Sequence, residues 1–183
     1  MIQPPRIEQL LIQLTIALQL PETRTLHWPN EAACAASAAA LAAALAAPSA
    51  GFAGLHDACI ELHGPLGAGK TTFVRHLLHA LGVQGRVKSP TYAVLESYEL
   101  PMAPHALTIS HFDFYRFDDP QEWEDAGFRD VFGSPGLKLA EWPEKAGDLL
   151  PPADLRIVID TDPDEQRSVR LDALSALGVE LLP

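Results

Sequence analysis

The sequence predicts an α/β fold: a P-loop NTPase-like mixed sheet, flanked by helices, with a C-terminal antiparallel strand pair. Two observations predict it. Residues 64–71 read GPLGAGKT, which fits G-x-x-x-x-G-K-[ST], and they stand between a predicted strand and a predicted helix. Strands alternate with helices early in the chain, and two late strands flank the turn residues 162–164. The length of 183 residues suits a single domain of this kind.

Three segments are expected before the glycine-rich loop. Residues 1–23 are an N-terminal extension of unknown role, and residues 24–183 form the P-loop domain. Apolar positions of the extension suit one helix face: Ile7, Leu10, Leu11, Leu14 and Leu18. Within the domain, residues 24–29 form a short strand. The alanine-rich residues 30–47 form a surface helix that packs on the sheet through Leu41 and Leu45.

Periodicity predicts the later elements. Residues 57–63 alternate apolar and polar side chains, as a strand does, and residues 72–81 place their leucines on one helical stripe before Gly82. The expected elements that follow are strands at 93–100 and 106–112, a short helix within 118–130, a strand at 137–141, and strands at 155–160 and 168–173.

The glycine-rich loop is a candidate phosphate site. Its glycines allow a tight turn that aims successive N–H groups at one anion, and the next helix points its positive end there. Lys70 is spaced to reach the outer phosphates, and the Thr71 hydroxyl is spaced to ligate Mg²⁺. Pro65 has no N–H to give, but the cradle amides come mainly from Gly67 onward, so we expect Pro65 to be tolerated.

Two strands downstream of the loop end in an acid, Asp113 and Glu141. In open α/β sheets the carboxyl ends of strands line the ligand crevice, and P-loop enzymes place such an aspartate near Mg²⁺. The alternative for Asp113 is an ion pair with Arg116. Thr91 follows a proline on a stiff loop where its hydroxyl could face metal or γ-phosphate, although these bare residues favour an ordinary loop.

The net charge and the small number of cysteines indicate which partners and which cellular compartment to expect. A net charge of −11 argues against a surface that binds nucleic acid by itself. Cys34 and Cys59 are too few for a disulfide framework, which favours a reduced, cytoplasmic setting. The start of the chain lacks a basic leader and is too interrupted for a membrane span. His76 and His79 lack the further ligands of a zinc site, so we predict no zinc.

Four segments in order closely resemble the bacterial TsaE (YjeE) family, small ATPases of tRNA threonylcarbamoyladenosine (t6A) biosynthesis. They are GPLGAGKTTFVRHLLHALG, VKSPTYAVLESYEL, HFDFYR and EWPEK, and the likeness runs from about residue 25 to 174. The P-loop alone is generic, whereas SPTY followed by HFDFYR and EWPE is much more specific. The first 23 residues have no counterpart in the family pattern.

The resemblance implies a division of roles around ATP and Mg²⁺. The implied catalytic residues are Lys70, Thr91, Asp113 and Glu141. The implied nucleotide-binding residues are Glu31, Gly67, Ala68, Gly69, Lys70, Thr71, Thr72 and Trp142. The implied magnesium ligands are Thr71, Asp113 and Glu141. In this pattern Thr91 belongs to a mobile loop that senses the nucleotide, Trp142 lies close to the nucleotide, and Glu31 starts the helix near the adenine.

The resemblance also implies a pathway and partners. The family acts with TsaD and TsaB, which transfer the threonylcarbamoyl group to adenosine 37 of tRNAs reading ANN codons. ATP hydrolysis by the TsaE subunit resets that complex, and the subunit does not transfer the group itself. The acidic chain agrees with a protein that leaves RNA contact to its partners. We expect a slow ATPase if a partner completes the site.

Other functions of a P-loop protein fit less well. A P-loop kinase of a nucleoside or small metabolite usually closes an arginine-bearing lid, but Arg116, Arg129 and Arg156 are scattered. A GTPase commonly reads guanine with Asn-Lys-x-Asp, and the chain's one asparagine is Asn30, upstream of the P-loop. A non-enzymatic adaptor would not need the lysine, threonine and two acids that the chain retains.

Overall fold

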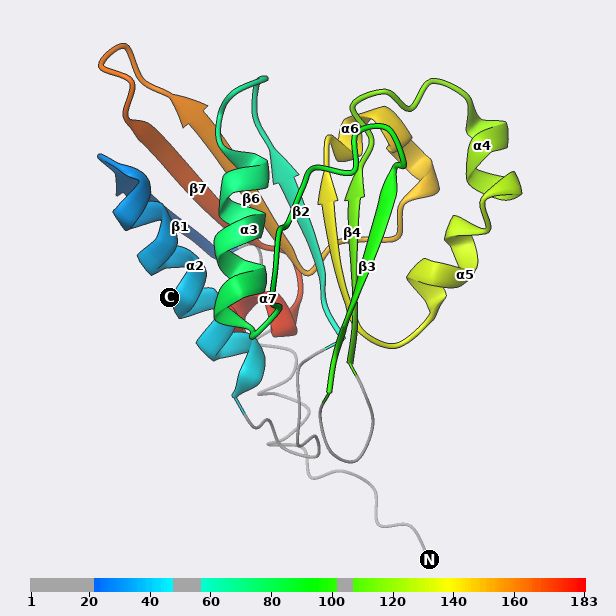
Figure 1. Cartoon of the computed structure of the whole chain (residues 1–183). Helices are drawn as coiled ribbons and strands as arrows, with labels where there is room; N and C mark the ends of the chain where they lie inside the picture. Colours follow the sequence, from blue (N-terminus) through cyan, green and yellow to red (C-terminus); the bar gives the residue numbers. More distant parts are fainter. Residues whose placement is uncertain (1–21, 48–56, 102–106) are drawn as a thin grey trace, which may run out of the picture.

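The computed structural model describes residues 22–47, 57–101 and 107–183, and within them the chain forms one seven-stranded sheet (Figure 1). The strand order is β1-β7-β6-β2-β5-β4-β3. The strands are β1 (Glu22–Trp28), β2 (Cys59–His63), β3 (Leu95–Leu100), β4 (Leu107–Asp113), β5 (Leu137–Glu141), β6 (Leu155–Thr161) and β7 (Arg167–Ala173). The helices are α2 (Glu31–Ala46), α3 (Lys70–Ala80), α4 (Pro120–Asp125), α5 (Phe128–Gly133), α6 (Pro143–Ala146) and α7 (Ala176–Glu180), with the 3-10 helix η1 (Gly147–Leu149).

The centre of the sheet is parallel and its margins are antiparallel. β6, β2, β5 and β4 run in the same direction, whereas β3 pairs antiparallel with β4 on one side and β7 and β1 extend the other. The predicted mixed sheet with a C-terminal antiparallel pair is therefore confirmed. Because the four central strands are parallel, their carboxyl ends meet at one edge, beside the start of α3.

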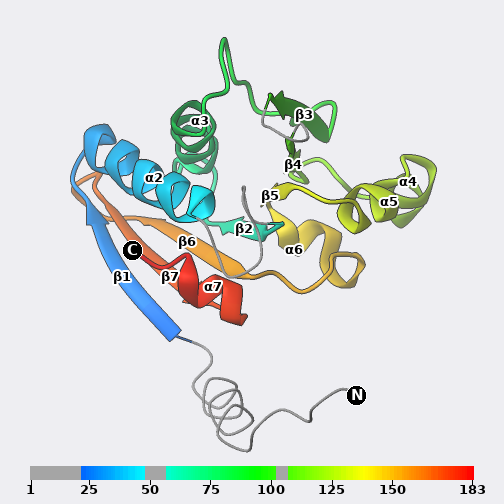
Figure 2. The same ribbon diagram turned by 90° about the horizontal axis from the view of Figure 1, so that it is seen from below.

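Helices cover both faces of the sheet. α2 and α3 lie side by side over one face, and α6 and α7 lie on the other (Figure 2). The expected packing of the alanine-rich helix is confirmed, because Leu41 and Leu45 are buried in the main apolar cluster with Leu77 of α3. The helix begins where expected, since the Asn30 side chain accepts a hydrogen bond from the Ala33 N–H at 3.0 Å.

A second cluster of aromatic side chains fills the space between β4, β5 and the pair α4–α5. Its buried aromatic members are Phe112, Phe114, Phe117, Trp123 and Phe128, and Ala140 and Ala146 pack among them. Successive side chains of a strand point to opposite faces. Phe112 therefore enters this cluster, while Ile109, His111 and Asp113 share the face that looks toward α3. Glu141 of β5 lies on that same face opposite Asp113.

The structure differs from the sequence prediction in a few elements. β1 begins at Glu22, two residues earlier than the predicted strand, because Glu22 and Thr23 pair with the end of β7. The single helix predicted within 118–130 is instead two helices, since Gly127 adopts a left-handed φ of 67° between α4 and α5. The apolar face predicted for the extension lies outside the described residues. In the described part of the chain, no helix combines the length and apolarity of a membrane span.

Candidate functional site

The phosphate-binding loop has the strand–turn–helix context that its motif requires. β2 ends at His63, and α3 begins at Lys70 after the turn. Gly64 has a φ of 137°, and a Cβ there would lie 2.2 Å from the Ile159 carbonyl oxygen. Gly69 caps α3 with a φ of 110°. Both positions require glycine, because other residues rarely adopt these angles and a side chain at Gly64 would clash with β6.

Lys70 folds back over the loop that it follows. Its ammonium donates to the carbonyl oxygens of Gly64 at 2.6 Å and Pro65 at 3.0 Å. The same nitrogen lies 3.8 Å from the ring centroid of Trp142, a cation–π contact. Burial lowers the pKa of Lys70, and the carboxylates led by Glu141 oppose that shift. Lys70 is thus a buried cation that is held by two neutral carbonyl oxygens, and an anion could replace these acceptors.

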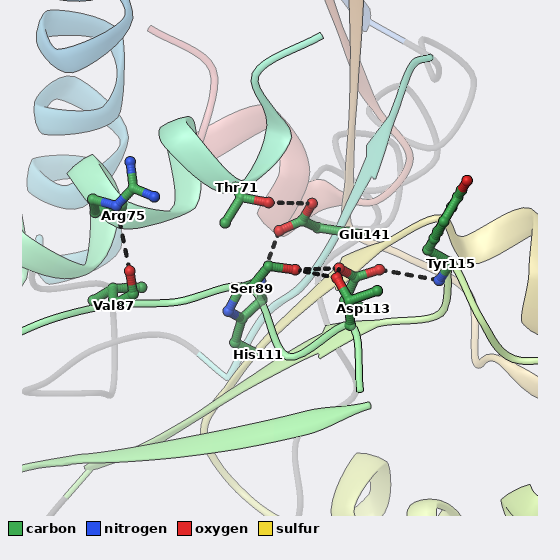
Figure 3. Close-up of polar contacts among 9 residues, drawn as sticks. Thr71, Arg75, Val87, Ser89, His111, Asp113, Tyr115 and Glu141 are labelled. Atoms are coloured by element: carbon green, nitrogen blue, oxygen red, sulfur yellow. Dashed lines mark hydrogen bonds and ion pairs between the residues drawn. The ribbon is translucent and has the colours of Figure 1, made fainter. Parts of the chain in front are cut away.

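Glu141 is held between two side chains from different elements (Figure 3). Thr71 Oγ1, in the first turn of α3, donates to Glu141 Oε2 at 2.9 Å. His111 Nε2, from β4, lies 2.9 Å from Glu141 Oε1, and both partners are buried. His111 Nδ1 is buried without a hydrogen-bond partner among the described residues, so the ring proton is assigned to Nε2. This donor fixes the carboxylate against Thr71.

Asp113 lies opposite Glu141 in the parallel register of β4 and β5. Its Oδ2 accepts a hydrogen bond from Ser89 Oγ (Figure 3) and a second one from Thr91 Oγ1 at 2.5 Å. Its Oδ1 accepts the Tyr115 N–H at 3.0 Å. The alternative ion pair with Arg116 does not form within the described residues. The Arg116 guanidinium instead lies 4.6 Å from the Tyr92 ring centroid.

The three predicted magnesium ligands therefore gather at the carboxyl edge of the sheet. Thr71 contacts Glu141 directly, and Asp113 stands at the paired position on the next strand. Hydroxyl and carboxylate oxygens are the ligands that Mg²⁺ takes, and Mg²⁺ commonly keeps water and phosphate oxygens in its other positions. This donor set fits the ion. Only two of its three members are carboxylates, so water and phosphate oxygens would complete the coordination; the described residues hold no group of three or more His, Cys, Asp or Glu side chains that could hold a metal.

A pocket of about 240 Å³ opens on the α2 side of the phosphate-binding loop. Its lining residues are Trp28, Pro29, Asn30, Glu31, Cys34, Gly67, Ala68, Gly69, Thr72, Glu165 and Arg167. Glu31 pairs there with His76 at 3.0 Å. Burial, reinforced by Glu31, raises the pKa of Cys34 from 9.0 to about 11. The pocket is the candidate space for the base and sugar of a nucleotide.

The predicted nucleotide residues thus divide between two sides of the loop. Glu31 and Thr72 line the pocket, together with residues 67–69. Trp142 does not line it. That ring stands over Lys70 on the other side, with its centroid 5.0 Å from that of Tyr115. A nucleotide lying across the loop would reach both sides.

Sequence reasoning missed three side chains at this site. Arg167 of β7 donates from Nε to the Ala68 carbonyl at 2.8 Å, although the two residues are 99 positions apart. No local pattern marks such a contact. His111 and Ser89 had a weak signal, because each stands two residues from a predicted site residue, at a spacing that shares a face in an extended chain.

Comparison with known proteins identifies relatives. The family model of the threonylcarbamoyl adenosine biosynthesis protein TsaE matches residues 28–169. The tRNA threonylcarbamoyladenosine biosynthesis protein TsaE of Haemophilus influenzae is 43% identical over 123 residues, which cover 67% of this chain and 75% of that protein. Its namesake from Bacillus subtilis is 36% identical over 115 residues, covering 63% of this chain and 69% of that protein.

A solved structure extends the likeness to the fold. The crystal structure of Bacillus subtilis YdiB superimposes with a TM-score of 0.64 and 26% sequence identity. The match covers 89% of this chain and 93% of that one.

Proposed function

Because the chain belongs to the TsaE family of threonylcarbamoyl adenosine biosynthesis proteins, we propose that it is an ATP-binding and ATP-hydrolysing subunit for t6A modification of tRNA. The modified position is adenosine 37 of tRNAs reading ANN codons. The protein acts on the complex of TsaD and TsaB, and it does not transfer the threonylcarbamoyl group itself. Contact with tRNA runs through these partners, in keeping with the net charge of −11.

One observation carries the ATPase proposal: the Thr71–Glu141 hydrogen bond beside the phosphate-binding loop. It joins the hydroxyl of the P-loop motif to a buried acid at the carboxyl end of β5, with Asp113 paired alongside. A loop alone is sufficient to bind phosphate. A loop with a hydroxyl and two carboxylates at its edge also has the oxygens that hold Mg²⁺, which neutralises charge on the phosphate oxygens when bound.

In the proposed mechanism, the chain positions the phosphates and stabilises charge. The amides from Gly67 to Thr72 and the start of α3 hold the phosphates. Lys70 exchanges its two carbonyl partners for phosphate oxygens, which are stronger acceptors because they carry charge. Asp113 or Glu141 orients the attacking water or the metal's waters. The reaction is phosphoryl transfer to water, which asks little covalent chemistry of the protein.

Thr91 has a separate role in this proposal. Its hydroxyl and that of Ser89 both bond Asp113, so the loop before β3 is tied to one of the two acids. A metal ion that binds Asp113 Oδ2, or a phosphate oxygen that accepts from the two hydroxyls in its place, would release both hydroxyls from Asp113. Nucleotide occupancy would then change the position of this loop, which carries the exposed Tyr92. The nucleotide-sensing role of Thr91 follows from this competition.

The test is phosphate release from ATP with Mg²⁺ by the wild-type protein and the Lys70→Ala variant. The matched control is Lys145→Ala, which removes an exposed lysine on α6. Wild type and control should release phosphate to water, and the folded Lys70→Ala variant should not. Normal turnover by that variant would contradict the site assignment. Phosphate found on a nucleoside or metabolite instead of in solution would favour the alternative P-loop kinase.

A further inference from the structure

Arg167 ties the β6–β7 hairpin to the outer side of the phosphate-binding loop. Its Nε donates to the Ala68 carbonyl at 2.8 Å, and its Nη2 lies 3.4 Å from the Gly67 carbonyl. Its Nη1 donates to the carbonyls of Glu165 and Gln166 in the hairpin itself. One planar guanidinium thus bridges two segments that are about 100 positions apart in the chain.

The orientation of these peptides matters for anion binding. In a trans peptide the C=O of one residue points opposite to the N–H of the next. An arginine that holds the Ala68 carbonyl therefore holds the Gly69 N–H toward the other side. Gly69 has a φ of 110° and belongs to the phosphate-binding loop. Such a loop binds an anion only when its N–H groups point toward that anion. Two glycines flank Ala68, so the backbone here has unusual freedom that a fixed donor would restrict.

The charge of Arg167 points to the same ligand. The guanidinium is half-buried and lines the 240 Å³ pocket. Within the described part of the chain its hydrogen-bond partners are carbonyl oxygens, and it forms no ion pair with a carboxylate. Arg156 and Arg170, in β6 and β7, do each pair with an acid. Arg167 thus keeps a formal positive charge at the loop, which favours an anionic ligand.

We propose that Arg167 is a positioning residue for the nucleotide phosphates. It holds the Ala68–Gly69 peptide so that the Gly69 N–H faces the anion before the nucleotide arrives, and it adds a fixed positive charge behind that peptide. This inference rests on the proposed nucleotide site and adds a member that the P-loop motif does not contain. Arginine suits the task because its rigid fork holds several carbonyls at once, whereas lysine offers a single point charge.

The experiment compares Arg167→Gln, Arg167→Lys and the control Arg170→Gln. Arg170 stands three residues later on β7, is exposed, and pairs with Asp172. Each protein is titrated with ADP and with adenosine, and binding is followed in the ¹H–¹⁵N spectrum, which also reports the Gly69 amide and whether the variant is folded. Adenosine is the probe that lacks phosphates.

The expected result is a selective loss. Arg167→Gln should weaken ADP binding by about tenfold or more, as for a lost charged hydrogen bond, and should leave adenosine binding within about twofold. Arg167→Lys should recover part of the loss through its charge. The Gly69 amide should shift in both Arg167 variants without ligand, and Arg170→Gln should match the wild type.

Two results would overturn the inference. One is wild-type ADP affinity in folded Arg167→Gln. The other is an equal loss of affinity for ADP and for adenosine, which would mean that Arg167 acts on the fold or on the nucleoside and not on the phosphates. A wild-type protein that binds no ADP would instead defeat the proposed nucleotide site, so the two failures are distinguishable.

Discussion

Thr71 and Glu141 stand 70 positions apart in the sequence and share a hydrogen bond of 2.9 Å between Oγ1 and Oε2. The bond joins the first turn of α3 to the last residue of β5. It exists because β2 and β5 are neighbouring parallel strands, so the loop after one faces the carboxyl end of the other. In the proposed site this pair holds the metal.

Glu141→Gln keeps the volume of the side chain and removes its charge. We expect ATP hydrolysis to fall at least about 100-fold, because a neutral amide binds Mg²⁺ weakly and stabilises less charge in the transition state. ADP binding without Mg²⁺ should be nearly unchanged, since the amide cradle is intact. Steady-state phosphate release and ADP titrations check both statements. Hydrolysis near the wild-type rate would remove Glu141 from the catalytic set.

His111 holds the other oxygen of Glu141 through its Nε2. His111→Phe leaves Oε1 without that buried donor, whereas His111→Gln can still offer an N–H. We expect the Phe variant to weaken Mg²⁺ binding by about 10- to 100-fold, the usual effect of losing a partner of a metal ligand. Its free energy of unfolding should fall by about 1–3 kcal/mol, the penalty for an unpaired buried group.

The Gln variant is the matched control for this pair. It should recover most of the Mg²⁺ affinity, measured as the Mg²⁺ dependence of nucleotide binding by calorimetry. Equal Mg²⁺ affinity in wild type and His111→Phe would mean that the histidine only fills space. Nitrogen-15 spectra of the wild type provide a direct view of the ring and should show the proton on Nε2.

The fluorescence of Trp142 should change when Mg-ADP binds. The Lys70 ammonium, 3.8 Å from the ring centroid, should leave the ring as it turns toward the phosphates. Trp28 also borders the candidate nucleotide pocket, so its contribution to the fluorescence change must be separated from that of Trp142. Trp28→Phe should retain most of the change and Trp142→Phe should lose it. An undiminished change in folded Trp142→Phe would place the reporter elsewhere.

Cys34 gives a chemical test of the pocket. Burial and the nearby Glu31 raise the pKa of its thiol from 9.0 to about 11, so the reactive thiolate is scarcer at pH 8 by roughly 100-fold. In a Cys59→Ser background, iodoacetamide should label Cys34 slowly at pH 8 and faster as the pH rises toward 11. Mass spectrometry of labelled protein measures the rate.

Bound nucleotide should slow the labelling of Cys34 further, because the thiol lies in the pocket wall. The comparison is made at one pH with and without saturating Mg-ADP. Equal rates in the two samples would show that ADP lies outside this pocket.

Local patterns in the sequence predicted most of the sheet. β5 has the predicted bounds Leu137–Glu141, and the hairpin β6–β7 lies where turn residues separate two alternating segments. These elements depend on period and turn chemistry, which are visible within a few residues. The place of β1 beside β7 depends on pairing across the whole chain, and no local pattern records it.

Local patterns in the sequence also predicted part of the candidate site. Lys70 could be predicted from the P-loop motif, and Asp113 and Glu141 could be predicted because each is the acid at the end of a predicted strand. Thr91 was predicted only through the family resemblance, and its contact and that of Ser89 with Asp113 were not predicted, because Ser-Pro-Thr is a common loop and only the folded chain brings it to β4. The role of Arg167 could not be predicted from the sequence either, since its contact with Ala68 depends on the packing of the hairpin against the loop.

The proposed function requires ATP hydrolysis at this site to sustain t6A formation by partner proteins. The most direct measurement is reconstitution with TsaD and TsaB from the same source, scoring tRNA modified per complex over many turnovers. We predict that modification continues beyond a first round with the wild-type protein, and stops without it or with folded Lys70→Ala. Equal multiple-turnover modification in all three reactions would show that t6A formation does not depend on ATP hydrolysis at this site.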